Sequence, residues 1–491
     1  MSANPQPIRH PDRFFLGGTW VEPSSSARIE VRDSASEEVF LSVAEAQVED
    51  MDRAVAAARK AFDEGPWPRL THAERAVWLN KIADAWTKRA GDIAETWVRE
   101  SGVLHSVAKY AAVNPASTIR FHAGLAESFA WEEPHTSGDG LRALLVREPV
   151  GVVGAIIPWN APNALMAYQT AAALIAGCTV IVKASPEAPA AAYILAEICE
   201  EIGLPAGVLN FVTADREVSE RLVRHPGVDK ISFTGSTAAG RRIGSICGER
   251  IARFTLELGG KSPAVILDDY DLDKAAQSLA QTARFLTGQV CSSLTRLIVT
   301  KGRHDAFVDA LAGRFGQVKV GDPFEASSEM GPLAMARQRE RVESYIAKGR
   351  QEGARLATGG GRPAHLERGY FVEPTVFANV DNGSTIAREE IFGPVLCVIP
   401  ADSEEQAIEI ANDTIYGLNS SVFTNDPERA YAVARRLRAG TVGHNAFKTD
   451  FSIAFGGFKQ SGIGREGGTE GMHPFLEAKT IILDQRVPKS S

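Results

Sequence analysis

The pattern of hydrophobic and polar residues changes at about residue 150. In the first hundred residues, apolar side chains recur at helical spacing from 48 to 64, and the run stops at Gly65-Pro66. Thr71 and Glu74 form a capping box that opens the next helix, because each side chain can satisfy a free backbone N–H group. The first hundred residues are therefore predicted to be helical.

Beyond residue 150, short β-branched runs alternate with helical segments. Strands alternating with helices at this spacing predict βαβ units, and runs that are apolar on both faces predict a parallel sheet covered on both sides. A second α/β region is expected over about 260–455. The predicted strands are 152–157, 178–182, 208–212, 230–233 and 264–267, and the predicted helices are 188–202, 238–247, 306–314 and 404–412.

Residues 131–149 interrupt this order. They are polar and rich in turn residues until a strand-like run over 141–146, and the tail carries another apolar run over 480–483. Two such strands could pair with each other or with a partner subunit, because open strand edges tend to be paired or covered. The expected organisation is one domain from 1–128 and 150–258, a second from 259–455, and an oligomerisation segment from 129–149 and 471–491.

Composition narrows the class of protein. The 491 residues are 44% hydrophobic and 23% charged, which is typical of a well-cored soluble protein and not of a disordered one. The net charge of -8 argues against nucleic acid or an anionic membrane as a partner. No signal peptide and no run of eighteen apolar residues is visible, so a cytoplasmic location is expected.

The five cysteines show no metal or disulfide pattern. No CxxC motif occurs, which predicts neither a zinc site nor a disulfide framework and suits a reducing compartment. Four of them are interpreted as small core residues: Cys178, Cys199, Cys247 and Cys397. Cys291 differs, because it lies in a Gly- and Ser-rich stretch after a helix, and it is a candidate nucleophile.

Two polar residues beside predicted strands are candidates for catalysis. Glu257 ends a hydrophobic run and precedes two glycines; apolar surroundings would raise its pKa toward the range of a general base, although it could equally be an exposed residue at a strand end. Asn160 follows the first core strand, where its amide could donate to an oxyanion, or it could simply be a turn residue between prolines.

Two glycine-containing loops invite a phosphate-binding interpretation. In the first, the run 231–234 leads through Gly235 and Ser236 into a helix, whose free N–H groups and dipole favour phosphate, although a plain structural turn also fits. The second, 462–467, is a literal GxGxxG, but no hydrophobic strand precedes it, so it is interpreted as a loop without a cofactor role.

Together these segments resemble the NAD(P)-dependent aldehyde dehydrogenase superfamily. The resemblance covers about residues 14–483 and implies a Rossmann-like cofactor domain, an α/β catalytic domain and a small β extension for oligomerisation, giving a homodimer or homotetramer. The matching segments, in the family's order, are 158–160 (PWN), 233–237 (FTGST), 257–261 (ELGGK), 288–291 (GQVC), 389–395 (EEIFGPV) and 455–466 (FGGFKQSGIGRE).

The resemblance implies a catalytic role for three residues. Cys291 would attack an aldehyde carbonyl, and the Asn160 amide with the Cys291 backbone N–H would hold the oxyanion of the thiohemiacetal. After hydride transfer to the nicotinamide, Glu257 would activate water to hydrolyse the thioester. No metal is required.

The resemblance also implies cofactor and substrate contacts. Gly235 and Ser236 would meet the pyrophosphate, Lys183 the adenosine ribose and Glu390 the nicotinamide ribose. The cofactor channel would be completed by Trp159, Leu258 and Phe392. The aldehyde pocket would be lined by Tyr168, Phe447 and Phe455, together with Ala161 and Ala164. The two alanines stand where bulkier side chains are frequent, which favours a roomier entrance and a hydrophobic or aromatic aldehyde.

Alternatives remain open for the cofactor, the substrate and the function. Many NAD-preferring members carry a glutamate three residues after the lysine matched by Lys183, whereas here Pro186 stands there and Glu187 follows, so NAD is favoured but NADP is possible. Arg284 keeps charged semialdehydes open as substrates. Rival functions are a CoA-acylating dehydrogenase, whose members lack the base at Glu257, and a structural protein on the same fold that has lost its activity.

Overall fold

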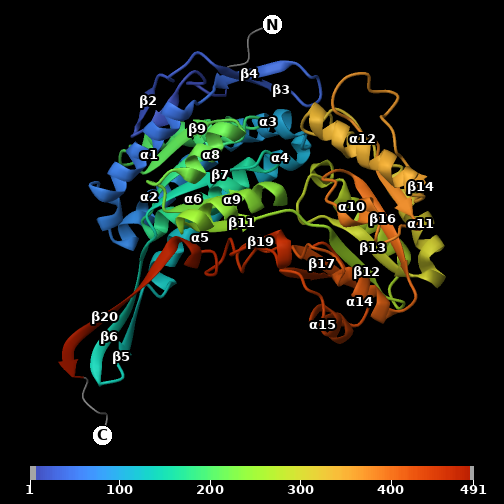
Figure 1. Ribbon diagram of the computed structural model, residues 1–491. Coiled ribbons are helices and arrows are strands. Elements are labelled where there is room, and N and C mark those ends of the chain that lie inside the picture. The colour runs from blue at the N-terminus through green and yellow to red at the C-terminus, as the bar shows by residue number, and fades with distance from the viewer. Residues whose placement is uncertain (1–6, 487–491) are drawn as a thin grey trace.

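The computed structural model describes residues 7–486 and shows two α/β units with a projecting β arm (Figure 1). The first sheet has the strand order β19-β11-β10-β7-β8-β9-β1-β2. Its parallel centre confirms the predicted sheet. The strands are β1 (Phe14–Leu16), β2 (Thr19–Val21), β7 (Val152–Ile156), β8 (Thr179–Ala184), β9 (Leu209–Thr213), β10 (Lys230–Thr234), β11 (Arg253–Glu257) and β19 (Gly462–Ile463).

Helices cover both faces of this sheet, as its two-sided apolar strands require. Val152 and Ile181 belong to one buried cluster, whereas Val153 and Val180 belong to the other, because successive side chains of a strand point to opposite faces. The helices are α1 (Val48–Asp63), α2 (His72–Lys88), α3 (Ala90–Ser101), α4 (His105–Ala111), α5 (Asn114–Ser128), α6 (Pro162–Ala176), α7 (Ala190–Ile202), α8 (Arg216–Arg224) and α9 (Thr237–Arg250).

The prediction of helices for the first hundred residues is wrong before α1. This segment forms β1, β2 and the hairpin of β3 (Arg28–Arg32) and β4 (Val39–Ala44). In β3, Ile29 and Val31 alternate with charged residues, and that period of two is the strand signal that the helical interpretation overlooked. From α1 onward the prediction is confirmed, including the capping box of Thr71 and Glu74.

The second sheet follows from residue 262 in the order β14-β15-β16-β13-β12-β17-β18, parallel except at β14. The strands are β12 (Ser262–Ile266), β13 (Leu294–Thr300), β14 (Arg355–Thr358), β15 (Thr375–Ala378), β16 (Val395–Ala401), β17 (Asn419–Phe423) and β18 (Thr441–His444). The helices are α10 (Leu272–Ala283), α11 (Lys301–Phe315), α12 (Ala336–Gln351), α13 (Thr385–Arg388), α14 (Glu404–Asn412) and α15 (Pro427–Ala434).

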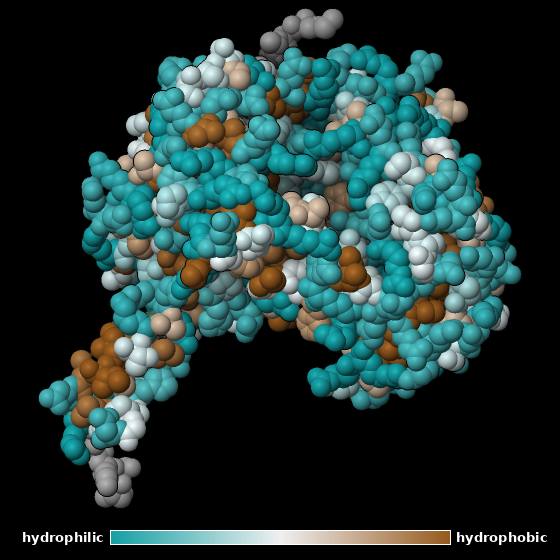
Figure 2. Space-filling model, viewed as in Figure 1, coloured by the Kyte–Doolittle hydropathy of each residue, from teal (hydrophilic) through white to brown (hydrophobic). Residues whose placement is uncertain are grey.

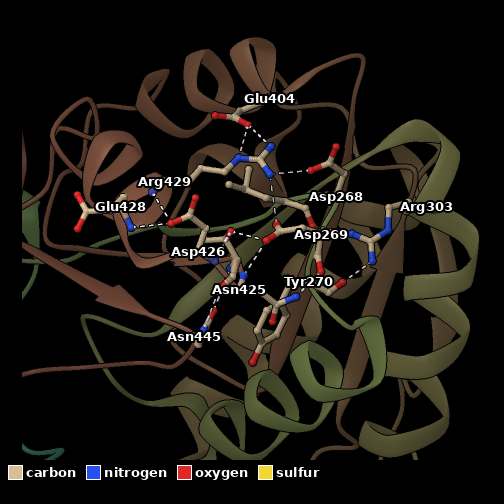
Figure 3. Close-up of polar contacts among 12 residues, drawn as sticks. Asp268, Asp269, Tyr270, Arg303, Glu404, Asn425, Asp426, Glu428, Arg429 and Asn445 are labelled. Atoms are coloured by element: carbon tan, nitrogen blue, oxygen red, sulfur yellow. Dashed lines mark hydrogen bonds and ion pairs between the residues drawn. The ribbon is translucent and has the colours of Figure 1, made fainter.

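An ion-pair cluster joins the carboxyl ends of β12 and β17 (Figure 3). Asp269 accepts hydrogen bonds from the Thr424 hydroxyl at 2.7 Å and the Asn425 N–H at 2.8 Å. The Arg429 guanidinium pairs with Asp268 at 2.9 Å and also with Glu404. These charges hold two neighbouring loops together at the surface of the second unit.

The arm is a three-stranded antiparallel sheet in the order β20-β6-β5, and it stands away from both units (Figure 1). Its strands are β5 (Glu132–Thr136), β6 (Leu141–Pro149) and β20 (Leu476–Arg486). The two strand-like runs of the sequence pair with each other, with Thr480 opposite Leu145. Figure 2 shows hydrophobic residues gathered on the arm, where Ile482 is 57% exposed. The last five residues of the expected oligomerisation segment, 487–491, lie outside the described residues.

Between residues 7 and 486, the chain has neither a membrane-spanning helix nor a cluster of metal-binding side chains. None of the helices between residues 7 and 486 is long and apolar enough to cross a lipid bilayer. The same part of the chain holds no group of three or more His, Cys, Asp or Glu side chains placed to bind a metal ion.

Candidate active site

The strand order creates a crevice at the carboxyl end of β7. The chain runs from β7 through β8 to β9 on one side, and β10 with β11 lies on the other side of β7. In open α/β sheets, ligands bind where the strand order reverses in this way. The candidate residues Trp159 and Asn160 follow β7, Gly235 and Ser236 follow β10, and Glu257 is the last residue of β11.

Cys291 is the one half-exposed cysteine, and the other four are buried, as predicted for core residues. It lies just before β13, after a short segment with unusual backbone geometry. Leu286, Thr287 and Gly288 have φ angles of 49°, 54° and 72°, which is a left-handed conformation that costs free energy in the first two residues. This strained segment turns the chain so that Cys291 reaches the interface between the two units.

The environment of Cys291 opposes ionisation of its thiol. Burial raises the pKa of Cys291 to about 12, and the carboxylates of Glu390 and Glu257 add to the increase. The backbone N–H groups of Ser292 and of Cys291 itself act in the other direction. Both candidate carboxylates therefore lie close enough to the sulfur to influence its charge.

Asn160 is buried and tied directly to the cysteine segment. Its Nδ2 donates a hydrogen bond to the backbone carbonyl of Gln289 at 2.9 Å. An amide nitrogen carries two hydrogens, so one N–H fixes the side chain while the other remains for a ligand. This bond ties Asn160 to a residue two positions before Cys291, the other residue that was expected to hold the oxyanion.

Glu257 is a buried carboxyl group without a partner. Its side chain is 2% exposed, and neither carboxylate oxygen has a hydrogen-bond partner among the described residues. Burial and the nearby carboxyl of Glu466 raise the pKa of Glu257 well above its ordinary value, while Arg465 opposes the increase. Buried polar groups are almost always paired, so an unpaired carboxyl at the end of a strand indicates a chemical role rather than a structural one.

Glu390 approaches the glycine turn that follows β11. The Gly260 N–H donates to its carboxylate at 3.2 Å, and a Cβ on Gly259 would lie 2.3 Å from the same carboxylate, so a side chain there would displace Glu390. Burial raises the pKa of Glu390 to about 7. Two residues on, the Phe392 ring meets the Trp159 ring edge to face at 5.4 Å. Three of the predicted cofactor and catalytic segments, 158–160, 257–261 and 389–395, thus meet around this turn.

The turn between β10 and α9 has features that suit a dinucleotide. The start of α9 is partly exposed at Gly235 and Ser236, and a Cβ on Gly235 would lie 2.5 Å from the Phe233 ring, so the turn requires glycine. The Ser236 hydroxyl caps the helix by accepting from the Ala239 N–H at 3.3 Å. A helix start that is open to solvent, with free N–H groups, fits a pyrophosphate.

Lys183, the last but one residue of β8, is buried among acidic groups. Burial lowers its pKa to about 8, and the carboxylates of Glu187 and Asp215 oppose the decrease. Glu187 in turn accepts from the Ser185 hydroxyl and pairs with Arg337, which lies near the start of α12 in the second unit. In this type of sheet, an acidic residue after the second strand accepts a hydrogen bond from a ribose hydroxyl of the cofactor.

A stack of three aromatic rings lies beside α6. Tyr168 stacks on Phe451 at 4.3 Å, and Phe451 stacks on Phe455 at 4.2 Å between ring centroids. Phe447, predicted to line the same space, is partly buried and packs against the buried cluster of β12 and α10, and its role stays a prediction. Phe451 was not among the predicted residues, because the course of the 445–455 loop decides which aromatic residue meets α6.

Glu466 was also missed. It is 4% exposed, its carboxyl is close to that of Glu257, and burial raises its pKa to about 7. It lies in the literal GxGxxG of 462–467, which had been interpreted as a loop without a cofactor role, and only the acidic residue inside that motif could have drawn attention to it. The backbones of Phe455 and Glu466 form an isolated β-bridge. This bridge links the aromatic stack to the pair of carboxyl groups.

Comparisons with known proteins agree with this geometry. The model of the Aldehyde dehydrogenase family matches residues 20–481. Geranial dehydrogenase of Castellaniella defragrans is 46% identical over 471 residues, which covers 96% of this chain and 98% of that protein. 3-succinoylsemialdehyde-pyridine dehydrogenase of a Pseudomonas species is 41% identical over 474 residues, with 96% and 98% covered.

Solved structures superpose closely on the chain. Aldehyde dehydrogenase of Mycobacterium tuberculosis in complex with NAD+ matches with a TM-score of 0.94 and 43% identity, covering 96% of this chain and 98% of that one. A mutant of aldehyde dehydrogenase C of Pseudomonas syringae in complex with NAD+ and octanal matches with a TM-score of 0.93 and 38% identity, covering 97% and 98%. The overall architecture predicted from the sequence is thereby confirmed.

Proposed function

The chain belongs to the aldehyde dehydrogenase family, and on that premise we propose that it oxidises an apolar aldehyde to the carboxylic acid with NAD+ through a covalent intermediate on Cys291. One observation carries the proposal. The half-exposed Cys291 lies within the electrostatic influence of the unpartnered Glu257, and Asn160 is hydrogen-bonded to the segment two residues before it.

In the first half of the reaction, the Cys291 sulfur bonds to the carbonyl carbon and the thiol releases its proton to solvent. The negative charge that develops on the aldehyde oxygen is stabilised by the free N–H of the Asn160 side chain and the Cys291 backbone N–H. A preorganised donor of this kind is worth about 3 to 4 kcal/mol of barrier. When NAD+ is bound, its nicotinamide supplies the hydride acceptor, and a thioester on Cys291 remains.

In the second half, Glu257 accepts a proton from water as that water attacks the thioester carbon. The carboxylic acid leaves, and Glu257 passes the proton that it took from water to the departing Cys291 sulfur. A raised pKa suits Glu257 for this step, because a general base works best when its pKa is close to the working pH. Glu257 also argues against the two rival functions, since transfer to CoA needs no activated water and a structural protein needs no unpaired buried carboxyl.

For the cofactor, we propose that the first sheet supplies most of the contacts. Gly235 and Ser236 would bind the pyrophosphate, and Lys183 with Glu187 the adenosine ribose. Glu390, from the second unit, would bind the nicotinamide ribose, in a channel walled by Trp159, Leu258 and Phe392. A carboxylate at Glu187 would repel a 2′-phosphate, so we propose that NAD is preferred to NADP, which remains the alternative cofactor.

For the substrate, the rings of Tyr168, Phe451 and Phe455 support an apolar aldehyde, saturated or conjugated. The names of geranial dehydrogenase and of the octanal complex point in the same direction. Arg284, which could have anchored a charged semialdehyde, is paired with Glu329 at 2.7 Å. We therefore disfavour substrates with a second carboxylate.

For assembly and location, the exposed apolar residues of β20 support a homodimer or homotetramer in which the arm packs against another copy. Free cysteines throughout the described part of the chain suit a reducing compartment, and we propose the cytoplasm.

The test is a comparison of aldehydes and variants. Purified protein with NAD+ or NADP+ is given octanal, geranial, benzaldehyde and succinic semialdehyde, and reduced nicotinamide is followed by absorbance. We expect octanal and geranial to be turned over best with NAD+, and Cys291→Ala to be inactive with all of them. Turnover by Cys291→Ala, or none by the wild type with any aldehyde, would overturn the proposal.

A further inference from the structure

Helix α3 makes contacts that the sequence patterns did not connect with the site. The Trp97 indole N–H donates to the backbone carbonyl of Asn160 at 2.9 Å, and the Ser101 hydroxyl donates to the carbonyl of Trp159 at 2.7 Å. Trp97 is 4% exposed and Ser101 is fully buried. Both bonds hold the backbone at the point where it leaves β7.

The end of the same helix also holds the cysteine segment. The Gln289 side chain, which is fully buried, donates from Nε2 to the Ser101 carbonyl at 3.2 Å and to the Leu286 carbonyl at 2.9 Å. Its Oε1 accepts from the Ala334 N–H at 2.9 Å. Asn160 in turn donates to the Gln289 carbonyl. The hydrogen bonds therefore form a closed ring through the end of α3, the residues 159–160 that follow β7, and the segment before Cys291.

We propose that Trp97, Ser101 and Gln289 are positioning residues. They fix the Asn160 amide relative to Cys291, so that the amide N–H and the Cys291 backbone N–H can both donate to the aldehyde oxygen. The inference rests on the proposed function. Any buried carbonyl group requires a hydrogen-bond partner. Here the two donors, Trp97 and Ser101, come from a helix about sixty residues earlier in the chain and bond to the consecutive carbonyls of Asn160 and Trp159. A displacement of 1 Å at such a site can cost about 100-fold in rate.

A double-mutant cycle with a matched control tests this. Trp97→Phe removes the indole N–H and keeps most of the ring, and it is made in the wild type and in Asn160→Ala. Trp86→Phe is the control, because the Trp86 N–H also donates to a backbone carbonyl, that of Ala112 at 2.9 Å, and Trp86 is also buried. kcat, KM, thermal unfolding and the alkylation rate of Cys291 by iodoacetamide are measured for each.

We expect Trp97→Phe to lower kcat between about 10-fold and 100-fold with little change in KM or in alkylation rate, because only the oxyanion contact is displaced. In the Asn160→Ala background, the same change should cost less than about twofold, since there is no amide left to position. Trp86→Phe should lower the unfolding temperature to a similar extent and leave kcat within about twofold.

Equal losses from Trp97→Phe in both backgrounds would overturn the inference, since a purely structural role is independent of Asn160. If Trp97→Phe fails to fold, Ser101→Ala takes its place in the same cycle with the same expected coupling. A wild-type rate in Asn160→Ala would instead refute the proposed function itself. The two failures are therefore distinguishable.

Discussion

Two groups of acidic side chains lie at the carboxyl ends of strands, and they differ in how they are satisfied. After β12, Asp269 has a hydroxyl, a backbone N–H and Arg429 as partners, and Asp268 shares that arginine (Figure 3). At β11, Glu257 is buried beside Glu466, and no oxygen of either has a partner among the described residues. The position in the fold is similar, but the electrostatics are opposite.

The difference separates carboxylates that stabilise the fold from carboxylates that are kept reactive. Partners lower the pKa of Asp269 although burial opposes them, whereas burial and a like charge raise the pKa of Glu257. An acid whose pKa is lowered stays an anion to lower pH, while an acid whose pKa is raised binds a proton more readily and can act as a general base. Four substitutions test this distinction.

The largest effect is expected for Glu257→Gln. Without the base, the thioester should form but hydrolyse slowly, so steady-state turnover should fall by about 10² to 10⁴-fold while the first turnover is retained. Stopped-flow absorbance of the reduced nicotinamide should show a burst followed by a stall. Asp269→Asn, which also changes a carboxyl to an amide, is the control and should turn over normally. A wild-type steady-state rate in Glu257→Gln would contradict the distinction between reactive and stabilising carboxylates.

Glu466→Gln should change the pH profile. The Glu466 carboxyl raises the pKa of Glu257, so its removal should lower that pKa. Glu257 acts as a base only when it is deprotonated, and hydrolysis should therefore persist to lower pH than in the wild type. Single-turnover hydrolysis of the acyl-enzyme, measured from pH 5 to pH 9, tests the sign. A shift of the acid limb to higher pH would contradict the coupling.

Asp269→Asn should affect stability and not activity. Loss of charge at its hydrogen bonds to Thr424 and Asn425 should cost about 1 to 2 kcal/mol of unfolding free energy at pH 7. Because the folded pKa of Asp269 is lowered, its contribution is present above the ordinary carboxyl pKa and is lost as the pH falls through the folded value. Urea unfolding at pH 7 and pH 2.5 should show a smaller difference from the wild type at pH 2.5.

The smallest effect is expected for Glu404→Gln, which removes one partner of Arg429. The side chains of this pair are each about one-third exposed, and pairs of this kind contribute about 0.2 to 1 kcal/mol. The loss should shrink further in 1 M salt, which screens exposed charges. Unfolding at low and high ionic strength measures it, and a loss above that of Asp269→Asn would reverse the ranking.

Local sequence patterns predicted the elements that alternate regularly. The apolar runs around β7 to β10 and the amphipathic pattern of α14 were found from periodicity alone, because each element buries a defined face. Cys291 stood out from the other cysteines because its neighbours are glycine and serine. Periodicity also existed in β3, but it spans only five residues and its alternation was overlooked.

Other parts of the site depend on contacts between distant residues. Glu466 meets Glu257 only because the chain returns to the first sheet about two hundred residues later, and Trp97 reaches Asn160 across sixty-three positions. The contact of Phe451 with Tyr168 depends on the path of one loop. No local pattern encodes such pairings, so only the three-dimensional arrangement reveals them.

The pairing of β19 with β11 has a consequence for biosynthesis. β11 ends at Glu257, but its outer neighbour, Gly462–Ile463, emerges from the ribosome after about two hundred further residues. At translation speeds of about 5 to 20 residues per second, that edge waits about 10 to 40 seconds for its partner. A nascent chain halted before residue 462 would carry an incomplete first sheet with an unprotected edge, where chaperones would be expected to act.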